Sequence, residues 1–163
     1  MMAAGLTGVY VPHPPNFEPL TLVVFCSGVL LGVRDGVLVG GLTMLVYSLL
    51  NPYGGVHPLI MASQVAGEMT AGAAGGVFAA LGLPTRSLAA RVVTLGATGL
   101  VLTAGYDLIT NLTTGIVFGQ IRATLIGGLP FALFHIGTNV AMFAAVGPPL
   151  VAVLARYRAR LSA

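Results

Sequence analysis

Apolar residues run along this chain in long blocks, and short polar or turn-like sequences separate the blocks. Apolar runs of this length are typical of helices that cross a membrane, because the core of a soluble protein does not absorb them. The separators predict five helical spans, at residues 20–33, 37–50, 58–81, 88–112 and 130–155. The first two are short for a bilayer about 30 Å thick, which needs about 20 residues, so we expect tilt or burial among neighbours.

Prolines and glycines mark where these spans begin and end. The segment before the first span ends in PHPPNFEP, whose four prolines exclude a regular helix, so residues 1–18 are expected to be irregular. We expect a tight turn at Arg34-Asp35-Gly36, and the sequences NPYGG and GLPTR end the second and third spans. A mixed segment then leads to Gly128, and Pro130 opens the last span, which is expected to kink at Gly147-Pro148-Pro149.

The composition also favours a membrane protein. Charged residues make up only 7% of the 163 residues, against about 25% in soluble globular chains, and the mean hydropathy is +0.97. The expected fold class is therefore an all-α membrane protein, a polytopic helical bundle. Glycine recurs at four-residue spacing in two stretches, which predicts faces where membrane helices approach closely. These glycines are Gly28, Gly32, Gly36 and Gly40, and then Gly72 and Gly76.

All seven basic residues are arginines, and they are scattered at the ends of the predicted spans. This scatter excludes nucleic acid as a partner and instead orients the chain in the lipid bilayer. Six arginines fall on one side, which the positive-inside rule assigns to the cytoplasm, and Arg122 falls on the other. We expect a multi-pass protein of the cell (inner or cytoplasmic) membrane with an external segment at residues 1–18, one transmembrane domain at residues 19–157 and a cytoplasmic tail at residues 158–163.

Polar side chains inside the apolar spans form three pairs at four-residue spacing, which places each pair on one face of its helix. Ionisable groups within a bilayer are costly and rare, so we interpret the pairs as a candidate functional site. With the orientation given above, all three pairs lie in the outer half of the membrane. The pairs are Gln64 with Glu68, Asp107 with Asn111, and His135 with Asn139.

Other interpretations of these pairs stay open. Gln64 and Asn139 could be hydrogen-bonding links between helices, worth about 0.6 kcal/mol each, and His135 could be a core histidine. Glu68 and Asp107 are harder to explain in this way, because a charged group at mid-bilayer costs about 2.5 kcal/mol or more. They are protonated, paired with His135, or directed into a wet cavity.

The flanking aromatic residues and the missing motifs bound the chemistry. Tyr106, Phe131 and Phe134 flank the polar pairs, where they either stack on a flat ligand or pack the bundle. The sequence contains no GxSxG elbow, HExxH helix, paired cysteine motif or phosphate loop, so we do not expect an enzyme. One alternative is an intramembrane metal-dependent enzyme whose metal ligands are Glu68, Asp107 and His135. Another is a structural bundle subunit without a ligand, in which the polar pairs only join helices.

Six sequence segments together resemble the substrate-binding S component of an energy-coupling factor (ECF) transporter. In chain order they are PNFEPLTLVVFCSGVLLG, VRDGVLVGG, LLNPYGG, QVAGEMTAGAAGG, YDLITN and LPFALFHIGTN, and they cover about residues 16–156. The resemblance implies the S subunit of an ECF-type ABC importer, which captures a vitamin or related micronutrient from the exterior. It implies no cofactor in this subunit, and its partners would be a transmembrane coupling protein and two ATPase subunits that use ATP.

The resemblance also implies roles for particular residues. It puts Asn16 and Glu18 in the first outer loop and Asn51 in the second. It puts on the pocket wall Gln64, Glu68, Asp107, Asn111, His135 and Asn139. With Tyr106 and Phe131 added from the flanking aromatic residues, these are the expected substrate-binding residues. No arginine is expected at that depth, so a deeply bound carboxylate lacks a fixed positive partner unless Arg122 folds over it. A neutral or cationic, donor-rich, flat heterocycle fits better.

The chain departs from the family pattern in two respects. S components typically have six helices, and the five spans expected here lack the first, which carries small residues that dock on the coupling protein. Nickel and cobalt members carry a histidine soon after Met1, whereas this chain begins Met-Met-Ala-Ala. The second departure weighs against the metal branch of the family.

Overall fold

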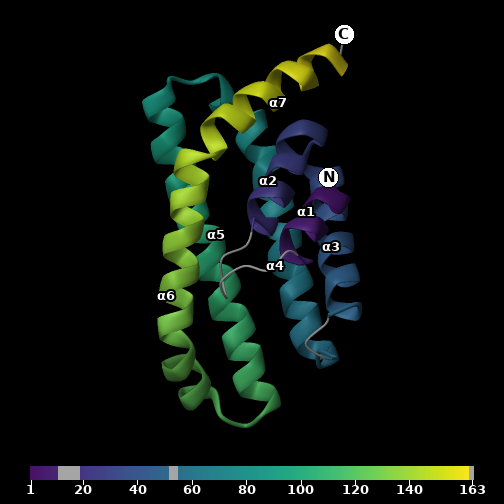
Figure 1. Ribbon diagram of the computed structural model, residues 1–163, viewed down its shortest axis with the longest axis vertical. Helices are drawn as coiled ribbons and strands as arrows, with labels where there is room; N and C mark the ends of the chain where they lie inside the picture. The colour runs from purple at the N-terminus through teal and green to yellow at the C-terminus, as the bar shows by residue number, and fades with distance from the viewer. Residues whose placement is uncertain (11–18, 52–54, 162–163) are drawn as a thin grey trace.

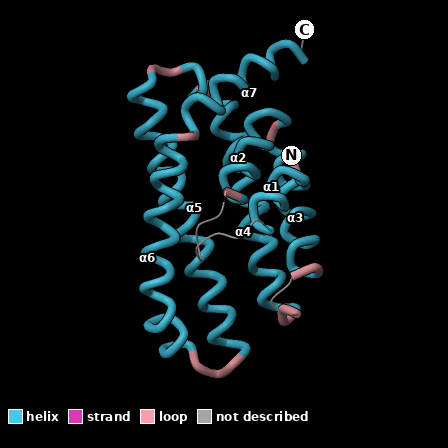
Figure 2. The backbone as a smooth tube through the Cα atoms, viewed as in Figure 1, coloured by secondary structure: helices cyan, strands magenta, loops and turns pink. Residues whose placement is uncertain are grey.

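The computed structural model describes residues 1–10, 19–51 and 55–161, and these ranges are almost entirely helical (Figure 1, Figure 2). They contain seven α-helices, one short 3-10 helix and no β-strand, which confirms the expected all-helical fold. In chain order the elements are α1 (Met2–Tyr10), α2 (Leu20–Leu31), α3 (Val33–Leu49), α4 (Pro58–Ala80), η1 (Leu83–Thr85), α5 (Leu88–Val117), α6 (Ile121–Ala145) and α7 (Gly147–Leu161).

Helix α4 holds the bundle together, because it packs against α2, α3 and α5. The short α1 lies against α2 and α3, while α5 and α6 form a long antiparallel hairpin. In Figure 1 the lower end of this hairpin extends past the other helices, and α7 runs across the upper end toward the C-terminus. The connections from α2 to α3 and from α4 to α5 also lie at the upper end.

Close glycine contacts join α2, α3 and α4. A Cβ atom built on Gly28 or on Gly36 would overlap the carbonyl oxygen of Gly72, and one on Gly72 would overlap the carbonyl oxygen of Gly36. Gly40 faces the backbone of Glu68 in the same way. The predicted helix-contact faces are therefore confirmed at Gly28, Gly36, Gly40, Gly72 and Gly76, since any larger side chain would separate these backbones. The prediction is wrong for Gly32, which has no such backbone contact.

Two boundaries near the start of the chain differ from the prediction. The turn predicted at Arg34-Asp35-Gly36 is wrong, because these residues lie in the first turns of α3 and the break falls at Gly32. Gly32 has a φ of 98°, a backbone conformation that glycine adopts most readily. The prediction that residues 1–18 are irregular is wrong for Met2–Tyr10, which form α1, since the helix-breaking prolines begin only after them.

Two further boundaries differ around the last predicted span. Helix α5 continues to Val117 and α6 begins at Ile121, so the long mixed connection is wrong and Pro130 lies inside α6, not in its first turn. The predicted kink at Gly147-Pro148-Pro149 is a break between two separate helices at Val146. The two prolines fall in the first turn of α7, where their missing N–H groups have no partner to lose.

Two helices, α5 and α6, are long and apolar enough to cross a membrane, and α2 is a shorter apolar helix. In the most apolar 18-residue stretch of each helix, 17% of α5 and 11% of α6 is buried. The core helix of a soluble protein, by contrast, is mostly buried. Large apolar side chains on this hairpin, such as Val93, Val101 and Leu133, are exposed. The hairpin therefore has the surface of a candidate membrane-spanning unit.

The arginines separate between the two ends of the bundle. Six belong to elements at the upper end of Figure 1, namely the start of α3, the loop after η1, the start of α5 and helix α7. Contacts between elements confirm this grouping: Nη1 of Arg158 in α7 donates to the Val29 carbonyl of α2, and Nη1 of Arg91 in α5 donates to the Pro148 carbonyl of α7, both at 3.1 Å. Arg122 starts α6 at the opposite end.

Candidate functional site

Two stripes of residues at four-residue spacing meet where α5 packs against α6. They comprise Gly99, Thr103 and Asp107 on α5, and His135, Asn139 and Phe143 on α6. Asp107 contacts His135, and a Cβ atom on Gly99 would lie 2.9 Å from Cγ of Phe143. In an antiparallel pair of helices these two contacts fix the register, and that register sets Thr103 opposite Asn139.

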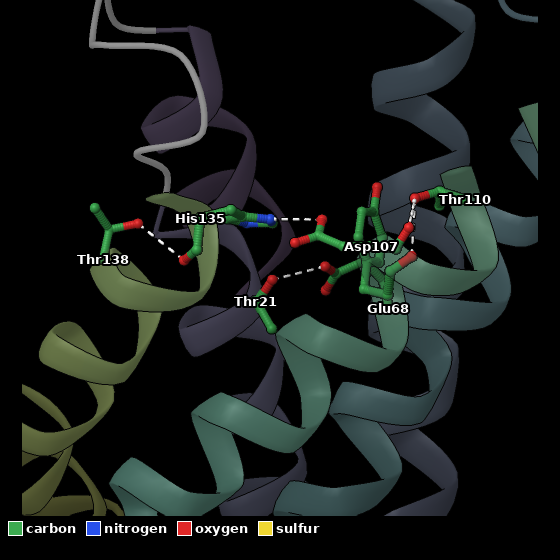
Figure 3. Close-up of polar contacts among 7 residues, drawn as sticks. Thr21, Glu68, Asp107, Thr110, His135 and Thr138 are labelled. Atoms are coloured by element: carbon green, nitrogen blue, oxygen red, sulfur yellow. Dashed lines mark hydrogen bonds and ion pairs between the residues drawn. The ribbon is translucent and has the colours of Figure 1, made fainter. Parts of the chain in front are cut away.

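The first polar contact in these stripes joins Asp107 and His135. Nδ1 of His135 lies 2.9 Å from Oδ1 of Asp107, and their side chains are 10% and 14% exposed, His135 first (Figure 3). When Asp107 is ionised it only accepts, so Nδ1 carries the hydrogen that is donated. The ring of Tyr106 meets the His135 ring edge-on, with centroids 6.2 Å apart and planes at 84°. The imidazole is thus oriented by a carboxylate and by an aromatic ring.

Glu68 reaches the same region from α4. It is 2% exposed, and Oγ1 of Thr21 on α2 donates a hydrogen bond of 2.9 Å to its Oε1. Figure 3 shows the side chains of Thr21, Glu68, Asp107 and His135 directed into one region of the bundle interior, from four different helices. We call the following six residues the polar cluster: Thr21, Glu68, Thr103, Asp107, His135 and Asn139.

Several buried polar atoms of the cluster make no hydrogen bond to any described residue. They are Oδ2 of Asp107, Oγ1 of Thr103 and both side-chain amide atoms of Asn139, a residue that is 0% exposed. Buried polar groups in native proteins are satisfied in about 90% of cases or more, and leaving one unsatisfied costs about 1–3 kcal/mol. The arrangement can therefore bind a small molecule that brings its own donors and acceptors.

The structure brings five of the predicted substrate-binding residues close to one another. These are Glu68, Tyr106, Asp107, His135 and Asn139. Tyr106, Asp107 and His135 meet through the contacts described above, Asn139 lies one turn from His135, and Figure 3 shows Glu68 directed into the same region. The polar cluster thus contains one member of the predicted α4 pair, one of the α5 pair and both of the α6 pair. Their common depth in the outer half of a membrane stays a prediction.

The other predicted residues lie around this cluster or away from it. Gln64, one turn from Glu68, accepts a hydrogen bond of 3.4 Å from Ser48 of α3. Asn111 is half-buried beside Gly128, and Asn51 is half-buried just after α3. Phe131 is 61% exposed. Asn16 and Glu18 lie outside the described residues.

Two members of the cluster, Thr21 and Thr103, are absent from the sequence-based prediction. Thr103 precedes Asp107 by four residues, so the spacing rule that selected Asn111 would also have selected it. Thr21 has no comparable signal, since it sits at the start of an apolar helix and only the packing of α2 on α4 brings it to Glu68.

The described part of the chain offers no group of three His, Cys, Asp or Glu side chains that could hold a metal ion. Glu68, Asp107 and His135 therefore do not form the ligand set that the metal-dependent enzyme requires in this conformation. Their chemistry here is hydrogen bonding, since Thr21 donates to Glu68 and His135 contacts Asp107 through Nδ1.

An apolar pocket of about 320 Å³ lies between α4 and α5, beside the polar cluster. Tyr106 is common to both, because it lines the pocket and its ring also contacts His135. Gly67 on α4 makes room for this ring, since a Cβ atom there would lie 3.1 Å from Cε2 of Tyr106. The pocket and the cluster therefore share one aromatic wall.

No family model matches this sequence, and neither a curated protein nor a solved structure gives a significant match to it. Function is therefore inferred from the residues and their geometry.

Proposed function

We propose that this chain is the substrate-binding S subunit of an ECF-type importer, and that it captures a small micronutrient in the polar cluster. The observation that carries the proposal is the fully buried side-chain amide of Asn139, which has no partner among the described residues, one turn from the Asp107–His135 pair. A ligand that bonds to this amide replaces hydrogen bonds that the folded chain does not otherwise make.

The chemistry of the cluster favours a neutral or cationic ligand that is rich in hydrogen-bond donors. Glu68 and Asp107 supply carboxylate oxygens, and Asn139 supplies an NH2 group with two donors and a carbonyl oxygen that accepts. The described arginines belong to the two ends of the bundle, so none is available to pair with a deeply bound carboxylate. Tyr106 forms an aromatic wall shared by the polar cluster and the apolar pocket, against which a flat ligand can pack.

Membrane embedding is supported by the exposed apolar surfaces of α5 and α6 and by the placement of the arginines. In the proposed orientation the six-arginine end faces the cytoplasm. Asp107 is then about 28 Å from the start of α5 and about 15 Å from its end, at 1.5 Å per residue. On α6, His135 is about 21 Å from the start and about 15 Å from the end, so the polar cluster lies near the middle of the hairpin. A substrate captured from outside would enter from the end where α5 ends and α6 begins.

The proposed partners follow from the sequence resemblance to S components: a transmembrane coupling protein and two ATPase subunits. The chain itself would bind and reorient, while ATP hydrolysis belongs to the partners. The tightly packed faces of α2, α3 and α4, joined at Gly28, Gly36 and Gly72, suit a bundle that moves as one body.

The direct test is mass spectrometry of the small molecules that co-purify with the detergent-extracted chain, followed by calorimetric titration of the stripped protein with the molecule identified. Asn139→Leu removes both amide atoms and is expected to weaken binding about tenfold or more, since a buried hydrogen bond is worth about 1–2 kcal/mol. Thr94→Val is the matched control, because Thr94 bonds only to carbonyls of its own helix. Unchanged affinity in Glu68→Ala, Asp107→Ala, His135→Ala and Asn139→Leu would show that the site is elsewhere.

A structural role is the second candidate, and the direct pairing of polar groups favours it. Thr21 bonds to Glu68, Ser48 to Gln64, and His135 to Asp107, so each contact joins two helices. In that case the same substitutions lower stability, while no small molecule co-purifies with the chain and none binds in the titration.

A further inference from the structure

Helix α7 is a separate element and not the end of a span. It follows the break at Val146 and crosses the upper end of the bundle in Figure 1. Its inner face is anchored: Val151 is 0% exposed, and Nη1 of Arg158 donates to the Val29 carbonyl of α2. Arg91 of α5 donates to the Pro148 carbonyl at the start of α7. These contacts fix which face of α7 points away from the bundle.

The outer face of α7 changes character along its length. Its first half presents Leu150 and Val153, which are 40% and 39% exposed. Its second half presents Arg156, Tyr157 and Arg160, of which Tyr157 is 55% exposed. Leu150 and Arg160 are about 15 Å apart at 1.5 Å per residue. An apolar-to-basic gradient over this distance matches the passage from hydrocarbon to lipid headgroups.

The basic half of this face encloses a hollow. Val153, Arg156, Tyr157 and Arg160 line a surface pocket of about 210 Å³. The guanidinium carbon of Arg160 lies 5.7 Å from the centre of the Tyr157 ring, which holds it beside the pocket. Nε of Arg156 bonds weakly, at 3.4 Å, to the Ala152 carbonyl of its own helix. Both guanidinium groups therefore keep donors for a ligand.

The charge around the hollow is not neutralised by described residues. Neither Arg156 nor Arg160 has a carboxylate partner there, in contrast to Arg158 and Arg91, which bond to the bundle. Of the described acidic residues, Glu68 and Asp107 lie in the polar cluster, and only Asp35 belongs to an element at this end. The hollow is therefore suited to an anion.

We propose that Arg156, Tyr157 and Arg160 bind the phosphate of an anionic phospholipid in the membrane leaflet at this end of the bundle. Two guanidinium groups match the planar, bidentate geometry of phosphate oxygens, and a tyrosine at headgroup depth is typical of the membrane interface. The apolar residues Leu150 and Val153 then lie beside the acyl chains. This inference rests on the membrane embedding that is part of the proposed function.

The test measures binding of phosphatidylglycerol to the full chain in neutral detergent micelles by native mass spectrometry. Phosphatidylcholine and inorganic phosphate are the comparison ligands. The double variant Arg156→Gln/Arg160→Gln is expected to bind phosphatidylglycerol roughly tenfold to thirtyfold more weakly. The control Arg34→Gln/Arg86→Gln removes the same charge from exposed arginines at the same end and is expected to keep the affinity.

Three results would overturn the proposal: equal losses in both double variants, no preference for phosphatidylglycerol over phosphatidylcholine, or displacement of the lipid by millimolar inorganic phosphate. Titration of the same variants with the co-purified micronutrient separates the two proposals. If the chain binds phosphatidylglycerol selectively but binds no micronutrient, only the proposed function is contradicted. If the chain binds the micronutrient but shows no selectivity for phosphatidylglycerol, only the lipid site is contradicted.

Discussion

His135 on α6 and Asp107 on α5 are joined at 2.9 Å, and this contact links the two longest helices of the described chain near the middle of the bundle. One turn away, the register of the same helices brings Thr103 opposite Asn139. The pair thus has two roles: it fixes the register of the hairpin, and it orients an imidazole beside buried polar atoms that have no described partner.

The first role predicts a coupling between the two side chains that stability measurements detect. Asp107→Leu leaves the buried imidazole without its carboxylate, and His135→Leu does the reverse, so each is expected to cost about 1–3 kcal/mol. The double variant should cost less than the sum by about 0.6 kcal/mol, the average of such couplings between membrane helices. Unfolding in mixed micelles measures this, with Asp107→Leu/Thr94→Val as the pair expected to be additive.

Thr21→Val is expected to destabilise the bundle by about 1 kcal/mol, because it removes the hydroxyl that donates to Oε1 of Glu68 while keeping the shape of the side chain. Thr21→Ser keeps the donor and should restore most of the loss. The measurement is again unfolding in mixed micelles. Equal stability of the valine and serine variants would mean that the hydroxyl does not matter for Glu68.

The sequence predicts the helix boundaries correctly where local turn and capping residues set them. The predicted span at residues 58–81 matches α4 almost residue for residue, since Pro58 opens it and the GLPTR turn ends it. The helix break at Gly32 could not be predicted from the sequence, because Gly28, Gly32 and Gly36 have the same spacing there. Packing distinguishes them: Gly28 and Gly36 meet Gly72, while only Gly32 takes a positive φ.

The candidate site could be predicted only in part, because its contacts also depend on how the helices pack. Four-residue spacing shows that Asp107 and Asn111 share a face, and the same holds for His135 and Asn139, but spacing does not show which face meets which helix. The tertiary register decides that Asp107 meets His135, while Gln64 turns to Ser48 on α3. The contact between Thr21 and Glu68 depends entirely on the packing of α2 against α4.

Gly72→Ala is expected to be among the most damaging single-methyl changes in the bundle. Its Cβ atom would overlap the Gly36 carbonyl and lie 3.1 Å from the Val37 nitrogen, so α3 and α4 must separate at a cost of about 1–3 kcal/mol. Gly137→Ala is the control, because nothing lies within 4 Å of a Cβ atom there and alanine favours helix by about 1 kcal/mol. Thermal unfolding should show opposite shifts, and equal shifts would contradict close packing at Gly72.

Single cysteines test the proposed orientation in the membrane. The sequence has one cysteine, Cys26, which is 3% exposed, so its background reaction with a maleimide should be low in the folded protein. Ala89→Cys places a thiol at an exposed site in the first turn of α5, near the arginine-rich end, and Gln120→Cys places one at an exposed site between α5 and α6.

In intact cells, a membrane-impermeant maleimide is expected to label Gln120→Cys and to spare Ala89→Cys, because the positive-inside rule sets the six-arginine end in the cytoplasm. Permeabilised cells should label both. The outcome also bears on uptake, since it decides which end of the α5–α6 hairpin faces the external solution from which a substrate is captured. The reverse pattern would contradict the proposed orientation, with the six-arginine end in the cytoplasm. Labelling of both sites in intact cells would contradict the membrane-spanning hairpin itself.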